Sequence, residues 1–157
     1  MSIDDALTAI ENSAVAHAIS KSDHLVAASL QIVHVLGFIT LLAALVLVSL
    51  RLLRWSFANH AMADVLRDAD RLLKIGLTLV TASGVLMFVA TPQLYFYKPM
   101  FELKMLLFIA AVLLQFMVLR KLVRDEGVRM WAVRTIVGLS LVTWFGIAFA
   151  GRMIGFT

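Results

Sequence analysis

The longest apolar run of the chain is AASLQIVHVLGFITLLAALVLVSL, residues 27 to 50. It contains no formally charged residue, and its only ionisable side chain is that of His34. A helix rises about 1.5 Å per residue, so a run of this length covers a hydrocarbon core of about 30 Å. The run therefore predicts a membrane-spanning helix.

Three shorter apolar runs follow, at residues 75–90, 105–119 and 135–151. Each falls below the roughly 18 uncharged residues of an isolated span, so flanking residues and long Lys and Arg side chains must complete each crossing. The predicted fold class is all-α, an integral membrane four-helix bundle that forms a single transmembrane domain over residues 1–157. Its helices are expected at about 24–54, 72–91, 101–123 and 130–154.

Composition agrees with lipid as the main solvent. Apolar residues make up 62% of the chain and charged residues 15%, whereas soluble domains are about half apolar and a quarter charged. The net charge of +4 comes from bases at the ends of apolar runs, so we expect no nucleic-acid partner. The chain has no cysteine, which excludes disulfides, thiolate metal sites and c-type haem attachment.

The basic residues predict the orientation. Ten of the fourteen lysines and arginines flank the connections between the first and second and between the third and fourth helices. They are Arg51, Arg54, Arg67, Arg71, Lys74, Arg120, Lys121, Arg124, Arg129 and Arg134. Because cytoplasmic loops are enriched in lysine and arginine, we expect this face in the cytoplasm and both termini on the outer side.

The N-terminal segment predicts a short amphipathic helix over residues 3–20 on the outer side, either a lid or an anchor. Ile3, Leu7 and Ile10 recur at helical spacing, and Ser2 precedes Asp5 by three residues in a capping arrangement. The segment is acidic and lacks the features of a secretory signal peptide. A further helical pattern runs from residue 55 to 71 on the cytoplasmic side.

Three ionisable residues are expected to form a cofactor-binding site: His34, Lys104 and Arg152. Their distances along the helices from the cytoplasmic basic edge come out at roughly 25, 24 and 27 Å, so they share one depth near the outer face. Ionisable groups inside a bilayer are costly and are candidates for function. Imidazole binds metals, which makes His34 the predicted metal ligand, while lysine and arginine hold anionic groups.

Haem b is one cofactor that suits these residues, with iron on His34 and propionates on Lys104 and Arg152. A second axial ligand would come from another protomer or from one of Met87, Met153, His24 and His17. A quinone is equally compatible. There are also structural interpretations: His34 bonds to a neighbouring helix, and Lys104 and Arg152 reach to the membrane interface.

Several stretches carry a resemblance to a known family. They are IVHVLG (32–37), SLRLL (49–53), TASGVLMF (81–88), KPMFELKMLL (98–107) and WFGIAFAGRMI (144–154). In their order and spacing the chain resembles, from residue 10 to 154, the DUF6644 group of small bacterial inner-membrane proteins, and more distantly CopD and b-type cytochrome membrane domains. It departs from the family pattern at Ser49, where Asp is usual, and at Arg54, where Gly is usual. The resemblance implies a bacterial inner (plasma) membrane location but no activity.

The leading functional hypothesis is an accessory redox or electron-transfer protein that binds a haem-like or quinone-like ligand near the outer face. The alternative is a structural or assembly subunit that packs against a membrane-protein partner or forms a homo-oligomer; a small transporter is a third. Hydrolytic and phosphoryl-transfer motifs are absent from the sequence, so the chain by itself is not expected to be an enzyme.

Overall fold

The computed structural model of the chain describes residues 2–21, 24–56, 59, 61–115 and 129–156. Within these residues all regular structure is helical. In chain order the helices are α1 (Ile3–Glu11), α2 (Ala14–Ser20), α3 (His24–Leu52), α4 (Met62–Ala90), α5 (Pro92–Phe96), α6 (Pro99–Leu113) and α8 (Met130–Met153).

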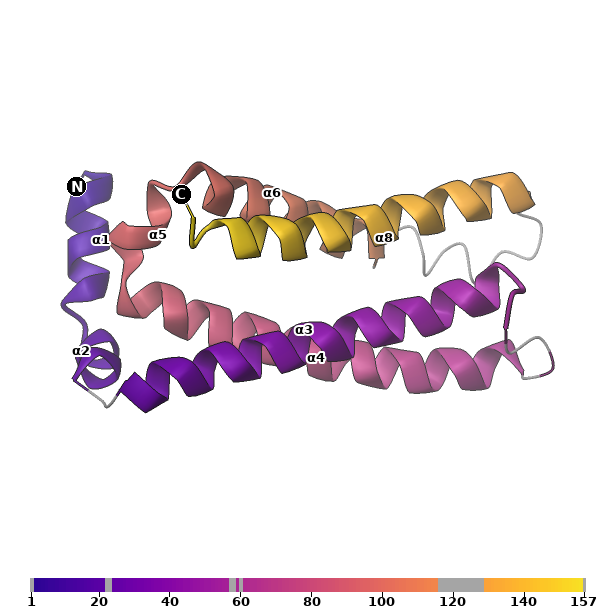
Figure 1. Cartoon of the computed structure of the whole chain (residues 1–157), viewed down its shortest axis with the longest axis horizontal. Coiled ribbons are helices and arrows are strands. Elements are labelled where there is room, and N and C mark those ends of the chain that lie inside the picture. Colours follow the sequence, from indigo (N-terminus) through magenta and orange to yellow (C-terminus); the bar gives the residue numbers. More distant parts are fainter. Residues whose placement is uncertain (1, 22–23, 57–58, 60, 116–128, 157) are drawn as a thin grey trace.

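The long helices form two antiparallel pairs, α3 with α4 and α6 with α8, which lie side by side (Figure 1). Helix α3 also contacts α8 and so joins the pairs. Both ends of the chain lie at the same end of the molecule, together with α1, α2 and α5 (Figure 1). We refer to this as the terminal end, and to the opposite end, where α3 stops and α4 starts, as the Arg54 end.

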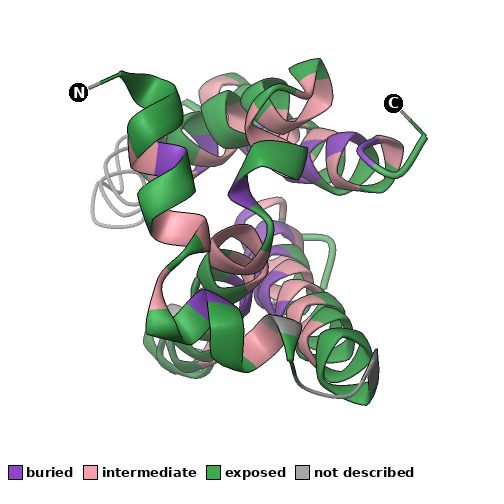
Figure 2. Ribbon diagram, turned by 90° about the vertical axis from the view of Figure 1, so that its left-hand side faces the viewer, coloured by how far each residue is buried: buried purple, intermediate pink, exposed green. Residues whose placement is uncertain are grey.

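Three of the helices are long and apolar enough to cross a membrane: Leu25–Leu52, Ala63–Ala90 and Met130–Met153. Only 22% to 33% of the most apolar part of each is buried inside the protein, and exposed residues cover the outward faces (Figure 2). Water would leave these large apolar faces uncovered, whereas lipid covers them. The chain is therefore a membrane protein.

Helix α6 is described over 15 residues, and the part of the predicted third helix beyond Gln115 lies outside the described residues. The same is true of three bases used to predict the orientation: Arg120, Lys121 and Arg124. A fourth membrane crossing therefore remains a prediction.

The helix bounds differ from the predicted ones in two places. The second long helix starts at Met62 rather than near residue 72, because no proline or glycine interrupts the chain there and a 2.6 Å ion pair between Lys74 and Asp70 supports its early turns. The segment predicted as a separate cytoplasmic helix thus forms the start of α4. At its other end α4 stops at Ala90, before Pro92, as the sequence predicts.

The predicted N-terminal helix is divided into α1 and α2 at Asn12. Ser13 accepts a hydrogen bond from the Ala16 N–H and so starts a new helix. The predicted capping box is confirmed: the Ser2 hydroxyl accepts from the Asp5 N–H, and the Asp5 carboxylate accepts from the Ser2 N–H. These bonds to Ser2 hold the pKa of the Asp5 carboxyl below its usual value.

Helices α1 and α2 lie across the terminal end (Figure 1). Helix α1 contacts α5, where Gln93 donates to the Thr8 hydroxyl at 3.2 Å and the Tyr97 hydroxyl donates to Asp4. Helix α2 contacts α4, and Ala16 is buried there. The N-terminal helices therefore form a cover over one end of the long helices.

Glycines set the close approach of α3 to α4. A Cβ added to Gly76 would lie 2.7 Å from the carbonyl oxygen of Gly37 and from the backbone nitrogen of Leu41. No side chain fits at that distance, so the backbones touch because position 76 is glycine. This contact fixes the register between α3 and α4.

Candidate functional site

His34 lies on α3, at the terminal-end side of the contact between Gly37 and Gly76, and its ring is half-buried against α4. Nδ1 of the ring is 3.0 Å from Oγ of Ser83. Helices α3 and α4 are antiparallel and touch where Gly37 meets Gly76. Residues before Gly37 in α3 therefore lie beside residues after Gly76 in α4, which places His34 next to Ser83. The predicted hydrogen bond of His34 to a neighbouring helix is thus present.

The hydrogen bond also indicates which nitrogen of His34 carries the proton. The Ser83 hydroxyl is 2.5 Å from the Leu79 carbonyl oxygen, which can only accept, so the hydroxyl hydrogen is used there. Ser83 Oγ then accepts from Nδ1–H of His34. In the neutral ring this leaves Nε2 with its lone pair, which is the tautomer that binds a metal or accepts a hydrogen bond.

Gly84 makes room for the His34 ring. A Cβ at this position would lie 3.1 Å from Cε1 and 3.5 Å from Nδ1 of His34, closer than ordinary van der Waals contact for the first atom. The adjacent residues Ser83 and Gly84 therefore act together: the serine binds Nδ1 of the ring, and the glycine leaves space for the Cε1–Nδ1 edge beside α4.

Lys104 projects from the opposite helix pair. Its side chain is half-buried on α6 and lies against α8, where a Cβ added to Gly151 would be 3.4 Å from the lysine Nζ. The Lys104 ammonium is near enough to His34 for its positive charge to act on the imidazole, although no hydrogen bond joins the two within the described residues. Within the described residues the Lys104 ammonium has no hydrogen-bond or ion-pair partner, so its three N–H donors are available to a ligand.

An aromatic layer lies directly beneath these two residues, towards the Arg54 end. Phe38 is one turn from His34 and Phe108 one turn from Lys104, each on the same helix face. Both rings pack against Trp144 of α8 with centroids 6.1 Å apart, and Trp144 is only 1% exposed. The layer closes the polar region off from the middle of the molecule.

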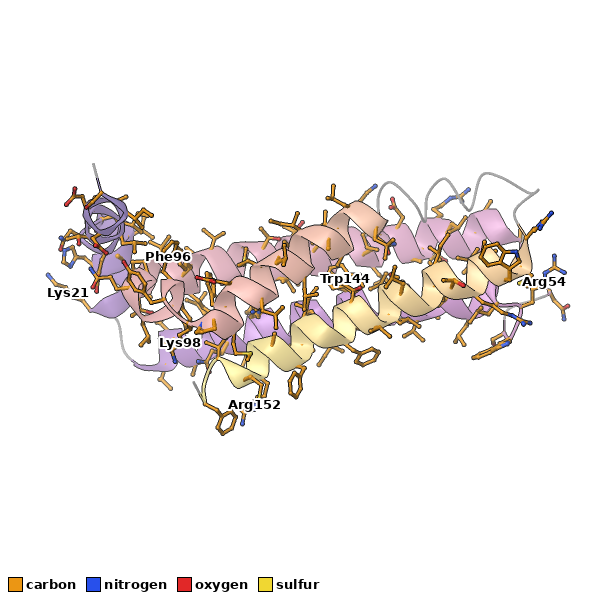
Figure 3. All side chains as sticks on the ribbon, turned by 90° about the horizontal axis from the view of Figure 1, so that it is seen from above. Lys21, Arg54, Phe96, Lys98, Trp144 and Arg152 are labelled. Atoms are coloured by element: carbon orange, nitrogen blue, oxygen red, sulfur yellow. The ribbon has the colours of Figure 1, made fainter. Side chains whose placement is uncertain are left out.

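Arg152 lies apart from the other two predicted site residues. Its guanidinium is exposed and sits 5.0 Å from the ring centroid of Phe156, at the terminal end of α8 (Figure 3). The neighbouring residue Gly151 faces Lys104, and a step of one residue turns about 100° around a helix. The structure therefore brings together His34 and Lys104, but not Arg152.

Lys98, at the terminal end of the molecule, bonds to the residue that follows α8. Its ammonium donates to the carbonyl oxygen of Ile154 at 2.8 Å, one of the carbonyls that the end of α8 leaves without a helical partner. Across the same end, the rings of Phe88 and Phe101 stack at 5.4 Å. These contacts hold the start of α6 against α4 and α8, and so position Lys104.

The predicted second axial ligands are scattered. Met87 is half-buried on α4, one turn from Ser83, and His17 is exposed on α2. The side chain of His24 lies outside the described part of the chain. Within the described residues there is also no group of three or more His, Cys, Asp or Glu side chains that could hold a bare metal ion. A metal on His34 would therefore have to bring most of its own ligands, as haem iron does.

A family model described as a family of unknown function, DUF6644, matches residues 9–157. The chain belongs to this family. No curated protein and no solved structure matches it. The matched range of this DUF6644 protein includes His34, Ser83 and Lys104, so the residues that the structure brings together all belong to the family domain.

The roles of Ser83 and Gly84 in this DUF6644 protein were not predicted. In the sequence both stand within an apolar run, TASGVLMF, which does not by itself pair them with His34. The useful signal was their adjacency, since a hydroxyl next to a glycine on one helix offers a partner and a space for a bulky polar side chain on the next.

Proposed function

We propose that this protein binds a haem-like or quinone-like ligand at His34 and Lys104, near the outer face of a bacterial inner membrane, and serves an accessory redox role. In this proposal four helices cross the membrane and both termini lie outside. The cover formed by α1 and α2 then lies over the outer end of the site.

The proposal rests on an imidazole oriented by a hydrogen bond and, near it, an ammonium that has no partner within the residues described. Nδ1 of His34 is bound to Ser83, which leaves the lone pair on Nε2 for another partner. Lys104 supplies donors from the other helix pair. A purely structural histidine would need only the bond to Ser83, and would leave the partially buried lysine opposite it without a use.

The ligand must meet both groups. Towards Nε2 it needs an electron-pair acceptor, such as haem iron or the hydroxyl hydrogen of a quinol. Towards Lys104 it needs an oxygen acceptor, such as a propionate or a quinone oxygen. Its apolar body would rest on the aromatic layer of Phe38, Phe108 and Trp144. Arg152, at the rim, is proposed to reach only an anionic group that extends beyond the helices.

Absorption spectra of the purified protein test the two forms of the ligand. If haem is bound, the oxidised protein shows a Soret band and the dithionite-reduced protein an alpha band, and His34→Ala loses both. If quinone is bound, extraction with organic solvent recovers it from wild type but not from His34→Ala. Folded wild-type protein with neither ligand would contradict the proposal and favour a structural subunit of a larger complex.

The proposed orientation can be tested because the chain has no cysteine. Lys21 and Ser56 are exposed, and they lie at opposite ends of the molecule. Figure 3 labels Lys21 at one end and, at the other, Arg54, which precedes Ser56 by two residues. Lys21→Cys and Ser56→Cys therefore form a matched pair. A membrane-impermeant maleimide should label the first variant in intact cells and the second only after lysis. The reverse pattern would contradict outward termini.

A further inference from the structure

Three buried polar groups between α6 and α8 have no hydrogen-bond partner within the described part of the chain. They are Oε1 of Gln115, Oγ of Ser140 and Nε1 of Trp144. The residues are 8%, 2% and 1% exposed. Lipid offers no hydrogen bonds, so each group without a partner costs free energy that a bound polar ligand would recover.

Ser140 differs from six other hydroxyls of the long helices. Six serine or threonine side chains in the long helices donate to the carbonyl four residues earlier: Ser29, Thr40, Ser49, Ser83, Thr135 and Thr143. This bond is the usual way for a hydroxyl in a membrane helix to be satisfied. The buried hydroxyl of Ser140 does not make it, and is left for a partner other than its own backbone.

The register of α6 and α8 brings the three groups to one level. Lys104 lies against Gly151 and Leu107 against Gly146, so residues of the two helices pair in opposite directions. Gln115 lies in the π turn that follows α6 at residues 114–115, two residues beyond the end of α6 at Leu113. Continuing the register over these two residues puts Gln115 near the level of residues 138–140. Trp144 is one turn from Ser140 on the same face, and side chains in a helix lean towards its N-terminus, so the indole leans towards Ser140.

We propose that Gln115, Ser140 and Trp144 hold at least one water molecule between α6 and α8. Oε1 of Gln115 needs a donor, Nε1–H of Trp144 needs an acceptor, and the Ser140 hydroxyl serves as either. Water offers both functions, and a buried water usually makes about three hydrogen bonds to groups that are otherwise unsatisfied. The three side chains supply that number.

This hydration site is separate from the site at His34 and does not rest on the proposed function. The aromatic layer of Phe38, Phe108 and Trp144 lies between the two. Ser140 is six residues from Arg134, which is about 9 Å along the helix, so the water lies in the half of the protein nearer the Arg54 end. Trp144 thus belongs to both regions: its ring is part of the aromatic layer, and its N–H is a proposed donor to the water.

Nuclear magnetic resonance of protein labelled with ¹⁵N-tryptophan in lipid nanodiscs tests the site. The chain has three tryptophans, and the missing signal in Trp144→Phe assigns the indole N–H of Trp144. We expect magnetisation transfer between this N–H and water that is lost or strongly reduced in both Ser140→Ala and Gln115→Leu. Magnetisation could also reach the Trp144 N–H through the Ser140 hydroxyl alone. Loss of the transfer in Gln115→Leu as well would exclude that route.

Ser49→Ala is the matched control. Ser49 is also buried, but its hydroxyl donates to the Leu45 carbonyl, so the water signal at Trp144 should be unchanged. No transfer from water in folded wild-type protein would overturn the proposal, as would a full signal in both variants. Thermal unfolding adds a second readout: Tm should fall in Ser140→Ala if water is held, and should rise if the groups are merely unsatisfied.

Discussion

Ser83 of α4 accepts a hydrogen bond from His34 of α3 at 3.0 Å, while its own hydroxyl hydrogen goes to the Leu79 carbonyl at 2.5 Å. This relationship leaves Nε2 of the imidazole with its lone pair. Loss of a group that orients a histidine ligand typically weakens metal binding about 10- to 100-fold. We therefore expect Ser83→Ala to weaken ligand binding by about that factor. The measurement is the Kd, or the fraction of ligand retained during purification.

Thr40→Val is the control for this variant. Thr40 also donates to the carbonyl four residues earlier in α3, but makes no bond to a histidine. Thr40→Val should leave the ligand affinity unchanged. If Ser83→Ala retained full affinity, the bond to Ser83 would have no part in orienting His34.

Lys104 and Arg152 are expected to respond differently to the same substitution. Lys104→Met removes the proposed donors to the ligand, and a hydrogen bond to a charged group contributes about 1.5–3 kcal/mol, or about 10- to 150-fold in Kd. Arg152→Met removes an exposed guanidinium over Phe156 and should change Kd less than threefold, on the order of a surface interaction. Equilibrium binding measures both; equal losses would return Arg152 to the site.

The contact between α3 and α4 predicts a large effect from one methyl group. Gly76→Ala puts a Cβ 2.7 Å from the backbone of α3, so we expect a loss of about 1–3 kcal/mol from the free energy of unfolding. At Gly138 nothing lies within 4 Å, and Gly138→Ala should instead gain up to about 1 kcal/mol through helix propensity. Unfolding in mixed detergent micelles measures both. Equal effects of the two variants would contradict the close crossing.

The hydrogen bond between Tyr97 and Asp4, which joins α1 to the end of α5, should be lost at alkaline pH. The hydrogen bond that Tyr97 donates to Asp4 raises the pKa of Tyr97 above its ordinary value of about 10. The neutral phenol is the form that binds, so the contact is intact below the ordinary pKa and is lost as the pH rises through the raised one. In a pH titration followed by the absorbance of tyrosinate, Tyr97 should ionise at a higher pH than an ordinary tyrosine.

Asp4→Asn provides the test of cause for this titration. It removes the negative charge that accepts the phenol hydrogen, and the pKa of Tyr97 should fall towards its ordinary value. Tyr95→Phe should leave this titration step in place and so assigns it to Tyr97. A Tyr97 titration that is the same in wild type and Asp4→Asn would show that α1 is not held by this bond.

The position of Lys104 relative to α8 agrees with the predicted depth, whereas the direction of side chains around each helix was not predicted. Counting residues from the basic edge put His34, Lys104 and Arg152 at one level, and Lys104 does lie against Gly151, next to Arg152. Depth follows from the helical rise alone. Which way a side chain points depends on the partner helix, and apolar runs without a polar stripe do not reveal it.

The same limit explains the helix bounds. Pro92 ends α4 because proline cannot continue a helix, and this is visible in the sequence. The start of α4 at Met62 was not predicted, because the charged residues of its first turns look like the end of a membrane span although the helix continues through them. Charge marks the edge of the bilayer rather than the end of a helix.

The proposed function requires that His34 holds a ligand. The most direct measurement is the amount of haem and of quinone per chain in protein purified from its native membrane in mild detergent. Wild type is compared with His34→Ala, provided that both proteins unfold at the same temperature. We predict that one of the two co-purifies with wild type at close to one per chain or per pair of chains, and is lost in His34→Ala. Neither ligand in folded wild-type protein, or equal amounts in both proteins, would contradict the account.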